Sequence, residues 1–97
     1  MNPELTVLMT VYNGEPYLRA AMDSVLNQTY SDFCFLIIDD ASTDRTREIV
    51  RSYADGRINL VCLEHNVGQT AALNLGLEQA TTSWIARMDA DDYSAPT

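Results

Sequence analysis

The fold is decided by the stretch Phe33-Cys34-Phe35-Leu36-Ile37-Ile38-Asp39-Asp40, a nearly continuous apolar run that ends in two carboxylates. Strands that are buried on both faces of a parallel sheet have this composition, because neither face meets solvent. We therefore expect a buried strand from Phe33 to Ile38. Asp39 and Asp40 then lie at its carboxyl end, where open α/β sheets bind their ligands.

Apolar runs and amphipathic segments alternate on both sides of this strand. The other expected strands are Leu5 to Met9, Ile58 to Leu63 and Trp84 to Met88. Helices are expected from Glu15 to Gln28, from Ser42-Thr43-Asp44 to about Ala54, and from Asn66-Val67-Gly68 through Ala80. This alternation predicts βαβ units. The expected fold class is therefore α/β: one domain of three layers, α/β/α, around a mostly parallel sheet in the chain order βαβαβαβ.

The third expected helix has a recognisable packing face. Ala72, Leu73, Leu77 and Ala80 recur at helical spacing and should share it. Gly76 weakens the helix interior but would permit close packing.

Polar residues follow all four expected strands. They are Thr10 to Glu15, Asp39-Asp40, Glu64 to Asn66 and Asp89 to Asp92. Right-handed crossovers between parallel strands place these clusters on one edge of the sheet, although they are far apart in sequence. This edge is the expected ligand site.

Charge limits the classes of ligand. The 97 residues include 14 acidic and 6 basic side chains, for a net charge of -8, and every basic residue is arginine. A lysine-bearing phosphate loop is therefore excluded, and no nucleic-acid partner is expected, because such a surface needs clustered positive charge. An anionic ligand would need a metal ion or backbone N–H groups to offset the acidic field.

The cysteines and the N-terminus bear on the compartment. Cys34 and Cys62 each lie inside an apolar run, where a reduced, buried thiol acts as a small hydrophobic side chain. Their spacing does not indicate zinc, the N-terminus lacks the pattern of a signal peptide, and no apolar stretch reaches the roughly 20 residues of a membrane helix. We expect a cytoplasmic, reducing location.

Asp89 and Asp91 are the candidate metal ligands. Residues i and i+2 of an extended segment project to the same side, so both carboxylates could reach one ion. Oxygen ligands suit Mg²⁺ or Mn²⁺, and Mg²⁺ takes one or two carboxylates together with substrate phosphates. A solvated acidic turn is the alternative interpretation. Repulsion among the acidic residues of 89–92 favours a cation.

The other candidates each have two interpretations. Asp40 could accept a hydrogen bond from a base N–H, whereas Asp39 could equally begin a turn or cap the next helix. Tyr12 could stack on a planar base or pack beneath its loop, and Glu15 could contact a ligand or cap its own helix. His65 is interpreted as a loop residue.

Four motifs together resemble the family 2 glycosyltransferases with the GT-A fold. They are Thr10-Val11-Tyr12-Asn13-Gly14, Ile38-Asp39-Asp40-Ala41-Ser42-Thr43-Asp44, Asn66-Val67-Gly68 and Asp89-Ala90-Asp91-Asp92. The resemblance spans residues 4 to about 95, and the joint occurrence of the motifs is far more specific than any one of them. It implies the Rossmann-like half of a GT-A fold.

The resemblance also implies roles for individual residues. The nucleotide pocket would be lined by Thr10, Tyr12 and Glu15, within a nucleotide-binding motif that includes Val11 and Asn13. Asp40 would bond a uracil-type base, with Asp39 in support. Asp89 would lie near the ribose, and Asp91, with Asp92 nearby, would hold the metal that bridges the diphosphate.

By the same resemblance, the expected activity is inverting, metal-assisted transfer of a sugar from a nucleotide-diphospho-sugar, a UDP-sugar by preference, to a glycan or lipid-linked acceptor in polysaccharide biosynthesis. The metal would act as a Lewis acid toward the leaving group. One departure is Ala72-Leu73-Asn74, where the family often has Ala-Arg-Asn, so a phosphate-side arginine is missing.

The 97 residues of this chain are too few for the whole expected transfer reaction. Such enzymes continue to an acceptor-binding half that carries the general base, so the base is expected beyond Thr97. Residues 1–97 are then expected to be the donor-binding portion, inactive alone and without an assignable catalytic residue. The full-length enzyme could be membrane-associated. The alternative function is an isolated nucleotide- and metal-binding module. A flavodoxin-like receiver domain fits poorly because the chain has no lysine.

Overall fold

The computed structural model of the chain describes residues 4–27 and 32–89. Its strands are β1 (Leu5–Val11), β2 (Cys34–Asp39), β3 (Ile58–Cys62) and β4 (Trp84–Asp89), and its helices are α1 (Glu15–Leu26), α2 (Thr46–Arg51) and α3 (Gln69–Gln79). Every element expected from the sequence is present, in the expected order.

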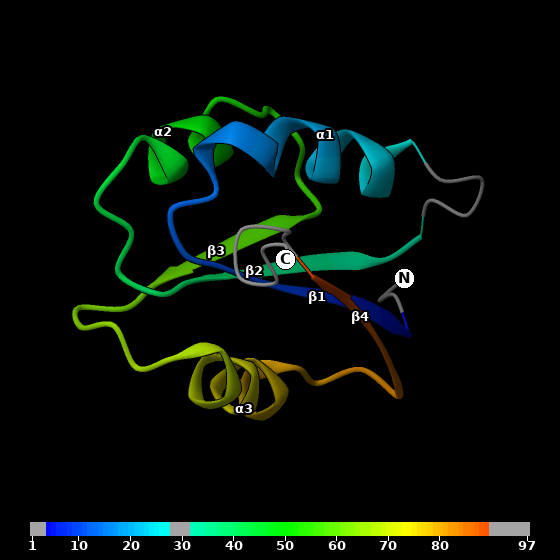
Figure 1. Cartoon of the computed structure of the whole chain (residues 1–97). Helices are drawn as coiled ribbons and strands as arrows, with labels where there is room; N and C mark the ends of the chain where they lie inside the picture. Colours follow the sequence, from blue (N-terminus) through cyan, green and yellow to red (C-terminus); the bar gives the residue numbers. More distant parts are fainter. Residues whose placement is uncertain (1–3, 28–31, 90–97) are drawn as a thin grey trace.

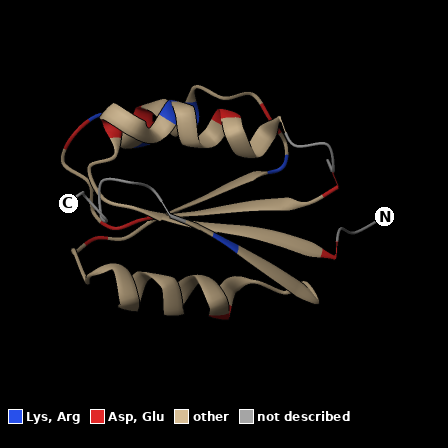
Figure 2. Ribbon diagram, turned by 45° about the vertical axis from the view of Figure 1, so that its right-hand side comes forward, with Lys and Arg blue, Asp and Glu red and all other residues tan. Residues whose placement is uncertain are grey.

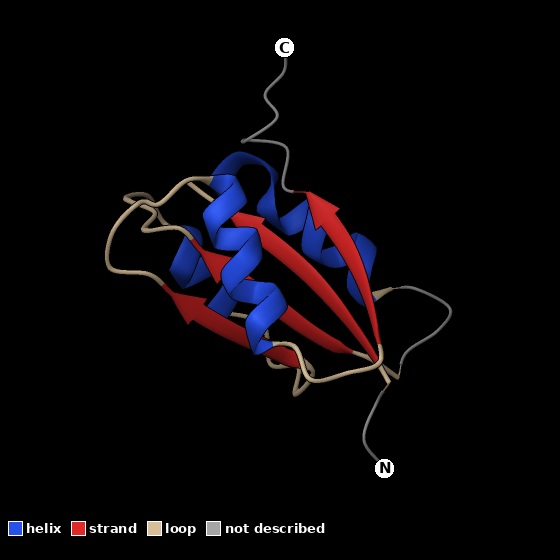
Figure 3. Ribbon diagram, turned by 90° about the horizontal axis from the view of Figure 1, so that it is seen from below, coloured by secondary structure: helices blue, strands red, loops and turns tan. Residues whose placement is uncertain are grey.

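The four described strands form one parallel sheet in the order β3-β2-β1-β4, and Figure 3 shows their arrows running in the same direction. Helices α1 and α2 cover one face, and α3 covers the other (Figure 1). The first two crossover connections lead outward along the sheet, from β1 to β2 and from β2 to β3. The third runs back past β2 and β1 and places β4 on the other side of β1. A right-handed crossover in the reverse direction passes over the opposite face, which accounts for α3. The predicted three-layer α/β/α fold is confirmed.

Strand β2 supplies the centre of two cores because its side chains alternate between the faces. Phe35 and Ile37 are fully buried in the cluster beneath α1 and α2. Leu36 and Ile38 are buried on the α3 face. The first cluster is the larger of the two and also contains Met9, Val11, Leu18, Met22, Val25, Phe33, Ile49 and Val50.

Helix α3 comes close to β1 at Gly76. A Cβ at this position would lie 2.5 Å from Leu8 Cδ1, so only glycine fits without displacing Leu8. The predicted close packing is therefore confirmed. Leu77, expected on the packing face with Ala72, is instead 41% exposed. The contact line runs through Ala72 and Gly76, and Leu77 is turned about 100° from Gly76 around the helix axis.

Both cysteines are free and only partly buried, which corrects the expectation of full burial. Cys34 opens β2 at the amino edge of the sheet, and Cys62 ends β3, the outermost strand on its side, so neither has neighbours all round. None of the described helices has the length and apolar character needed to cross a membrane.

Strand β4 is the other outermost strand of the described sheet. Its side chains from Trp84 to Arg87 are exposed, with Trp84 at 68% and Ile85 at 37%. Because successive side chains of a strand point to opposite faces, these two values show that both faces of β4 are partly open to solvent at its amino end. The described core therefore lies under β1, β2 and β3.

Candidate functional site

Three loops meet at the carboxyl edge of the sheet. The first loop (residues 12–14) follows β1, the second loop (40–45) follows β2, and the third loop (63–68) follows β3. Figure 2 shows acidic residues of the second and third loops gathered at this edge. The predicted meeting of these polar clusters is confirmed.

The register of the strands brings the end of β4 to the same place. Thr10 of β1 pairs with Ile38 on one side and Asp89 on the other, and Val11 pairs with Asp39. The residues that end β1, β2 and β4 therefore lie at one level across the sheet.

Several predictions for the end of the chain fall outside the described residues. Asp91 and Asp92 lie there, and so does Thr97, beyond which the general base is expected. Their roles stay predictions.

The first and second loops exchange hydrogen bonds in both directions, in what we call the inter-loop network. Three successive backbone N–H groups of the first loop and the start of α1 donate to side chains of the second loop and α2: Asn13 to Ser42 Oγ (2.9 Å), Gly14 to Thr46 Oγ1 (2.9 Å) and Glu15 to Asp44 Oδ2 (3.1 Å). The N-terminus of α1 is therefore capped from another loop. Its N–H groups are occupied, so they do not form a phosphate site.

The reciprocal bonds come from Asn13 and Glu15. Asn13 Oδ1 accepts from the N–H groups of Thr43 (2.7 Å) and Asp44 (3.3 Å), and Glu15 Oε1 accepts from that of Arg45 (3.3 Å). Asn13 has a φ of 51°, in the left-handed region that asparagine tolerates. Both side chains thus join the loops, and their contact with a nucleotide stays a prediction. Glu15 reaches toward α2 rather than capping its own helix.

Helix α2 was expected to begin at Ser42-Thr43-Asp44, but its N-cap position is Arg45, without a side-chain cap. Asp44 instead accepts the Thr46 N–H (2.9 Å) and hydroxyl while also holding Glu15. Burial of Asp44 acts to raise the pKa of its carboxyl, but the hydrogen bonds from Thr46 and Glu15 outweigh it and lower that pKa. The carboxylate of Asp44 is therefore an ionised junction of the network.

Asp39 is completely buried and points to the α1/α2 face, in line with Phe35 and Ile37. One carboxylate oxygen accepts from Arg47 Nε and from the Ser42 N–H (3.3 Å), and the other accepts from Ser42 Oγ. Arg47 Nη2 also donates to the carbonyl of Leu63 (2.9 Å) in the third loop. The Asp39–Arg47 pair thus joins the second loop, α2 and the third loop.

Asp40 points to the opposite face, toward α3. Its carboxylate accepts the backbone N–H groups of Val67 (Oδ1, 2.8 Å) and Gly68 (Oδ2, 2.9 Å), and its carbonyl accepts from Asn66 Nδ2 (3.2 Å). Gly68 is the N-cap of α3 and has a φ of 92°, which favours glycine. Asp40 therefore holds the Asn66-Val67-Gly68 motif in place. Its contact with a base stays a prediction.

The remaining candidates differ in burial. Thr10 is 3% exposed, the side chain of Val11 is fully buried in the core, and Tyr12 is partly exposed. Val11 also accepts the Asp40 N–H through its carbonyl (2.8 Å), so it joins β1 to the second loop. Tyr12 is the candidate of these three with side-chain surface to offer a ligand.

A divalent metal fits the oxygen chemistry of this edge, with Asp89 in register beside Thr10. Within residues 4–27 and 32–89 no three acidic, histidine or cysteine side chains cluster as a metal site would require. The metal prediction therefore depends on Asp91, which lies outside that part of the chain.

Two side chains of the site, Arg47 and Thr46, lie outside the four motifs that carry the resemblance to family 2. The signal for Arg47 was available in principle. An aspartate at the end of a fully buried strand needs a cation or several donors, and Arg47 stands in the first turn of the next helix, eight residues later. Thr46 has no comparable signal, because its acceptor role depends on where Gly14 lies.

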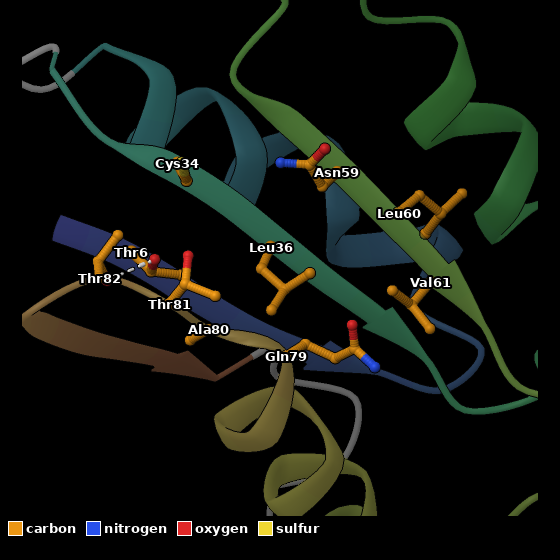
Figure 4. A pocket seen from close by; sticks show the side chains of 10 residues that line it. All are labelled: Thr6, Cys34, Leu36, Asn59, Leu60, Val61, Gln79, Ala80, Thr81 and Thr82. Atoms are coloured by element: carbon orange, nitrogen blue, oxygen red, sulfur yellow. Dashed lines mark hydrogen bonds between the residues drawn. The ribbon is translucent and has the colours of Figure 1, made fainter. Parts of the chain in front are cut away.

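Two cavities lie away from this edge. The larger, about 360 Å³, lies on the sheet beside the C-terminal end of α3, and its lining includes Thr6, Cys34, Asn59 and Thr82 (Figure 4). The other, about 200 Å³, lies over β1 and β4 on the α1 face and includes Val25 and Met88 in its lining. Among the described residues, none of those predicted for the ligand site lines either cavity.

Comparison with known proteins gives a consistent result. The family described as Glycosyl transferase family 2 matches residues 6–97. The chain is 40% identical over 95 residues to an uncharacterized glycosyltransferase of Haemophilus influenzae, and this match covers 96% of the chain and 38% of that protein. It is 39% identical over 88 residues to the UDP-Glc:alpha-D-GlcNAc-diphosphoundecaprenol beta-1,3-glucosyltransferase WfgD of Escherichia coli, covering 91% of the chain and 35% of that protein.

Solved structures agree with the sequence relatives. The mannosyltransferase PcManGT of Pyrobaculum calidifontis, in complex with GDP-Man and Mn²⁺, superposes with a TM-score of 0.83 at 31% identity. TarS 1–349 of S. aureus, in complex with UDP, superposes with a TM-score of 0.84 at 29% identity. Each match covers 94% of this chain and 28% of the solved chain. The chain thus spans about a third of the length of the proteins that it resembles.

Proposed function

Because the chain belongs to glycosyl transferase family 2, we propose that its carboxyl edge binds a nucleotide-diphospho-sugar donor, with a UDP-sugar as the preferred donor. The observation that carries this proposal is the convergence of the first, second and third loops and the end of β4 on one edge of a parallel sheet. Ligands of open α/β sheets bind at this edge. The related TarS structure contains UDP, and PcManGT contains GDP-Man.

In this proposal Tyr12 stacks on the base and Asp40 fixes its identity. Tyr12 is partly exposed at the end of β1. The Asp40 carboxylate is buried and accepts the backbone N–H groups of Val67 and Gly68 at the ligand edge. The resemblance of its motif to that of family 2 supports a bond from a uracil N3–H to the same carboxylate. Thr10, Val11, Asn13 and Glu15 shape the walls and loops around this pair.

Asp89 and Asp91 are the proposed ligands of Mg²⁺ or Mn²⁺. When bound, the metal would supply positive charge to the diphosphate, which the acidic chain itself cannot do. Transfer with inversion breaks the bond from the anomeric carbon to the diphosphate oxygen while an acceptor oxygen bonds to the opposite side of that carbon. The charge left on the nucleoside diphosphate is what such a site must stabilise.

Residues 1–97 are proposed to bind the donor, and not to perform the whole transfer reaction. No catalytic base is assigned in residues 1–97, and we propose that the base and the acceptor site belong to the part of the relatives that this chain does not cover, the part that would follow Thr97. WfgD is named for a diphosphoundecaprenol-linked acceptor, which supports a lipid-linked acceptor. We further propose a cytoplasmic location and a role in polysaccharide biosynthesis. A module that binds nucleotide and metal without transfer is the second candidate function.

Calorimetric titration tests donor binding. UDP, GDP and ADP are titrated into the chain with and without Mn²⁺, and then into Asp91→Ala and Asp32→Ala; Asp32 is an exposed acid outside the carboxyl edge. We expect UDP to bind best, and to lose affinity without Mn²⁺ or in Asp91→Ala but not in Asp32→Ala. Metal-independent binding that survives Asp91→Ala would refute the metal site.

A second pair of variants tests the base contact. Tyr12→Ala should weaken UDP binding by roughly 1–3 kcal/mol, the usual value of aromatic stacking on a base. Tyr17→Ala is the matched control, because Tyr17 is 46% exposed on α1. Equal affinity of the two variants would argue against stacking by Tyr12. Release of UDP from UDP-sugars in the presence of acceptor, measured on a chain extended past Thr97, separates a transferase from a binding module.

A further inference from the structure

We infer that the Asp39–Arg47 pair is a positioning device for the donor site, in which Arg47 holds the loops that carry Tyr12 and Asp40 in their binding geometry. This inference rests on the proposed function. It assigns a role to Arg47, which lies outside the four family motifs, and it separates positioning from mere stabilisation of the fold.

The first step is the charge of Asp39. Its side chain is 0% exposed, whereas that of Arg47 is 34% exposed. A fully buried carboxylate is costly unless it is paired and hydrogen-bonded. Arg47 Nε and the two donors of Ser42 provide this compensation. Replacement of a buried ion pair by apolar residues of similar volume is often neutral or stabilising, so stability alone does not account for the pair.

The second step is the path from the pair to Tyr12. The Ser42 hydroxyl donates to Asp39 and accepts the N–H of Asn13 at 2.9 Å. Asn13 is the residue directly after Tyr12. Asn13 in turn holds Thr43 and Asp44 through its side chain. The orientation of Ser42 set by Asp39 therefore fixes the first loop.

The third step is the path to Asp40. Arg47 Nη2 donates to the carbonyl of Leu63 (2.9 Å), which begins the third loop, and Asp40 binds the other end of that loop at Val67 and Gly68. The planar guanidinium can bond both Asp39 and Leu63, because its donors are held in a fixed fork. A lysine has the charge but not this geometry. Arg47 thus links the side chain of Asp39, the residue before Asp40, to the start of the loop whose other end Asp40 binds.

The test compares Arg47→Met, Arg47→Lys and the double variant Asp39→Ala/Arg47→Met with the wild-type chain. Arg51→Met is the matched control: it removes the same charge one turn later in α2, where the Arg51 side chain donates to Cys62 Sγ (3.7 Å) and not to any of the three loops of the described chain. UDP affinity in the presence of Mn²⁺ is measured by calorimetry, and stability by thermal unfolding. The amide resonances of Asn13 and Gly68 report the geometry of the two loops.

The double variant distinguishes positioning from stability, because it leaves no unpaired buried charge and should fold even where Arg47→Met does not. We expect it to fold cooperatively, with a thermal midpoint lowered by the lost Ser42 bonds, and to bind UDP about 10-fold or more weakly, as is usual when residues that orient a binding group are removed. The Asn13 and Gly68 resonances should shift. Arg47→Lys should fall between wild type and Arg47→Met, and Arg51→Met should bind as wild type does.

Wild-type affinity in the folded double variant, or equal losses in Arg47→Met and Arg51→Met, would overturn the inference while leaving the proposed function intact. Failure of the wild-type chain to bind UDP is distinguishable from these results, because no variant would then show UDP binding either. That result would overturn the proposed donor and the positioning role together.

Discussion

Asp39 and Asp40 are adjacent in the chain and equally buried, yet they act on opposite faces of the sheet. Asp39 meets a guanidinium and a serine on the α1/α2 face, whereas Asp40 meets two backbone N–H groups at the start of α3. The alternation of β2 sends one carboxylate to each layer. A single strand end thus attaches both helical layers to the ligand edge.

The two faces also differ in how they are closed. The α1/α2 face has the larger apolar cluster and the inter-loop network, while the α3 face has a small cluster around Leu8, Leu36, Ile38 and Ala72 and depends on close approach at Gly76. The first face should therefore contribute most of the stability. The second should be more sensitive to shape than to the number of apolar atoms.

Ile37→Ala and Ile38→Ala test this difference most strongly. Both isoleucines are 0% exposed and adjacent in β2, but they face the larger and the smaller cluster respectively. We expect Ile37→Ala to lower the free energy of unfolding by about 4 kcal/mol and Ile38→Ala by about 3 kcal/mol, within the usual range for large-to-small core changes. Urea denaturation measures both. A larger loss for Ile38→Ala would reverse the ranking of the two faces.

Asp40→Asn probes the attachment of α3. An amide has one acceptor oxygen, so one of the N–H groups of Val67 and Gly68 loses its partner and faces an NH₂ group. The expected loss is about 2 kcal/mol, typical of a hydrogen bond to a charged group. Hydrogen exchange at Gly68 should quicken. Asp32→Asn, at an exposed acid, should leave both stability and exchange unchanged.

Thr46→Val probes the inter-loop network at nearly constant volume. Thr46 is fully buried, and its hydroxyl accepts the N–H of Gly14 at 2.9 Å. Loss of this acceptor leaves a buried donor unpaired, so we expect a destabilisation of about 1–2 kcal/mol. Thr43→Val is the comparison, since the Thr43 hydroxyl is exposed and its bond to Asn13 is 3.4 Å long. Similar losses at both positions would show that the Gly14 bond is not the cause.

Gly76→Ala tests the shape of the α3 face. Alanine gains about 1 kcal/mol in helix propensity over glycine, but its Cβ would press on Leu8, and overpacking costs about 1–3 kcal/mol. We expect a net loss of about 1 kcal/mol that Leu8→Val partly relieves in the double variant. Gly56→Ala should be nearly neutral, because no atom lies within 4 Å of the added Cβ. Additive effects of Gly76→Ala and Leu8→Val would mean that the two side chains do not meet.

The smallest expected effect is on acid stability. The folded-state pKa of Asp44 is lowered, so its contribution is present above its unfolded value of about 3.9 and is lost as the pH falls through the folded value. In Asp44→Asn, stability should be lower at neutral pH and should change less between about pH 4 and the acid limit. Denaturation profiles at several pH values check this. An unchanged profile would assign the acid response to other carboxylates.

Much of the fold was predictable because it depends on local composition. The apolar run that ends at Asp39 predicted a buried parallel strand, and alternation along the chain predicted the layers and the shared edge. The site was less predictable, because its partners are non-local. Nothing near Glu15 indicates that it accepts the Arg45 N–H, and nothing near Asp40 indicates that it holds Gly68. The exposure of Leu77 also depends on tertiary contact, since only the approach at Gly76 fixes how α3 is rotated.

The inter-loop network has a consequence for the order of folding. Its bonds connect residues about 30 positions apart, such as Asn13 with Ser42 and Gly14 with Thr46. Contacts of this separation form only after the intervening chain has ordered, because loop closure must come first. Helices α1 and α2 can therefore begin to form before the first loop has reached its native conformation. Competence to bind a donor should thus appear late in refolding, as a single step, after most of the helical signal has returned.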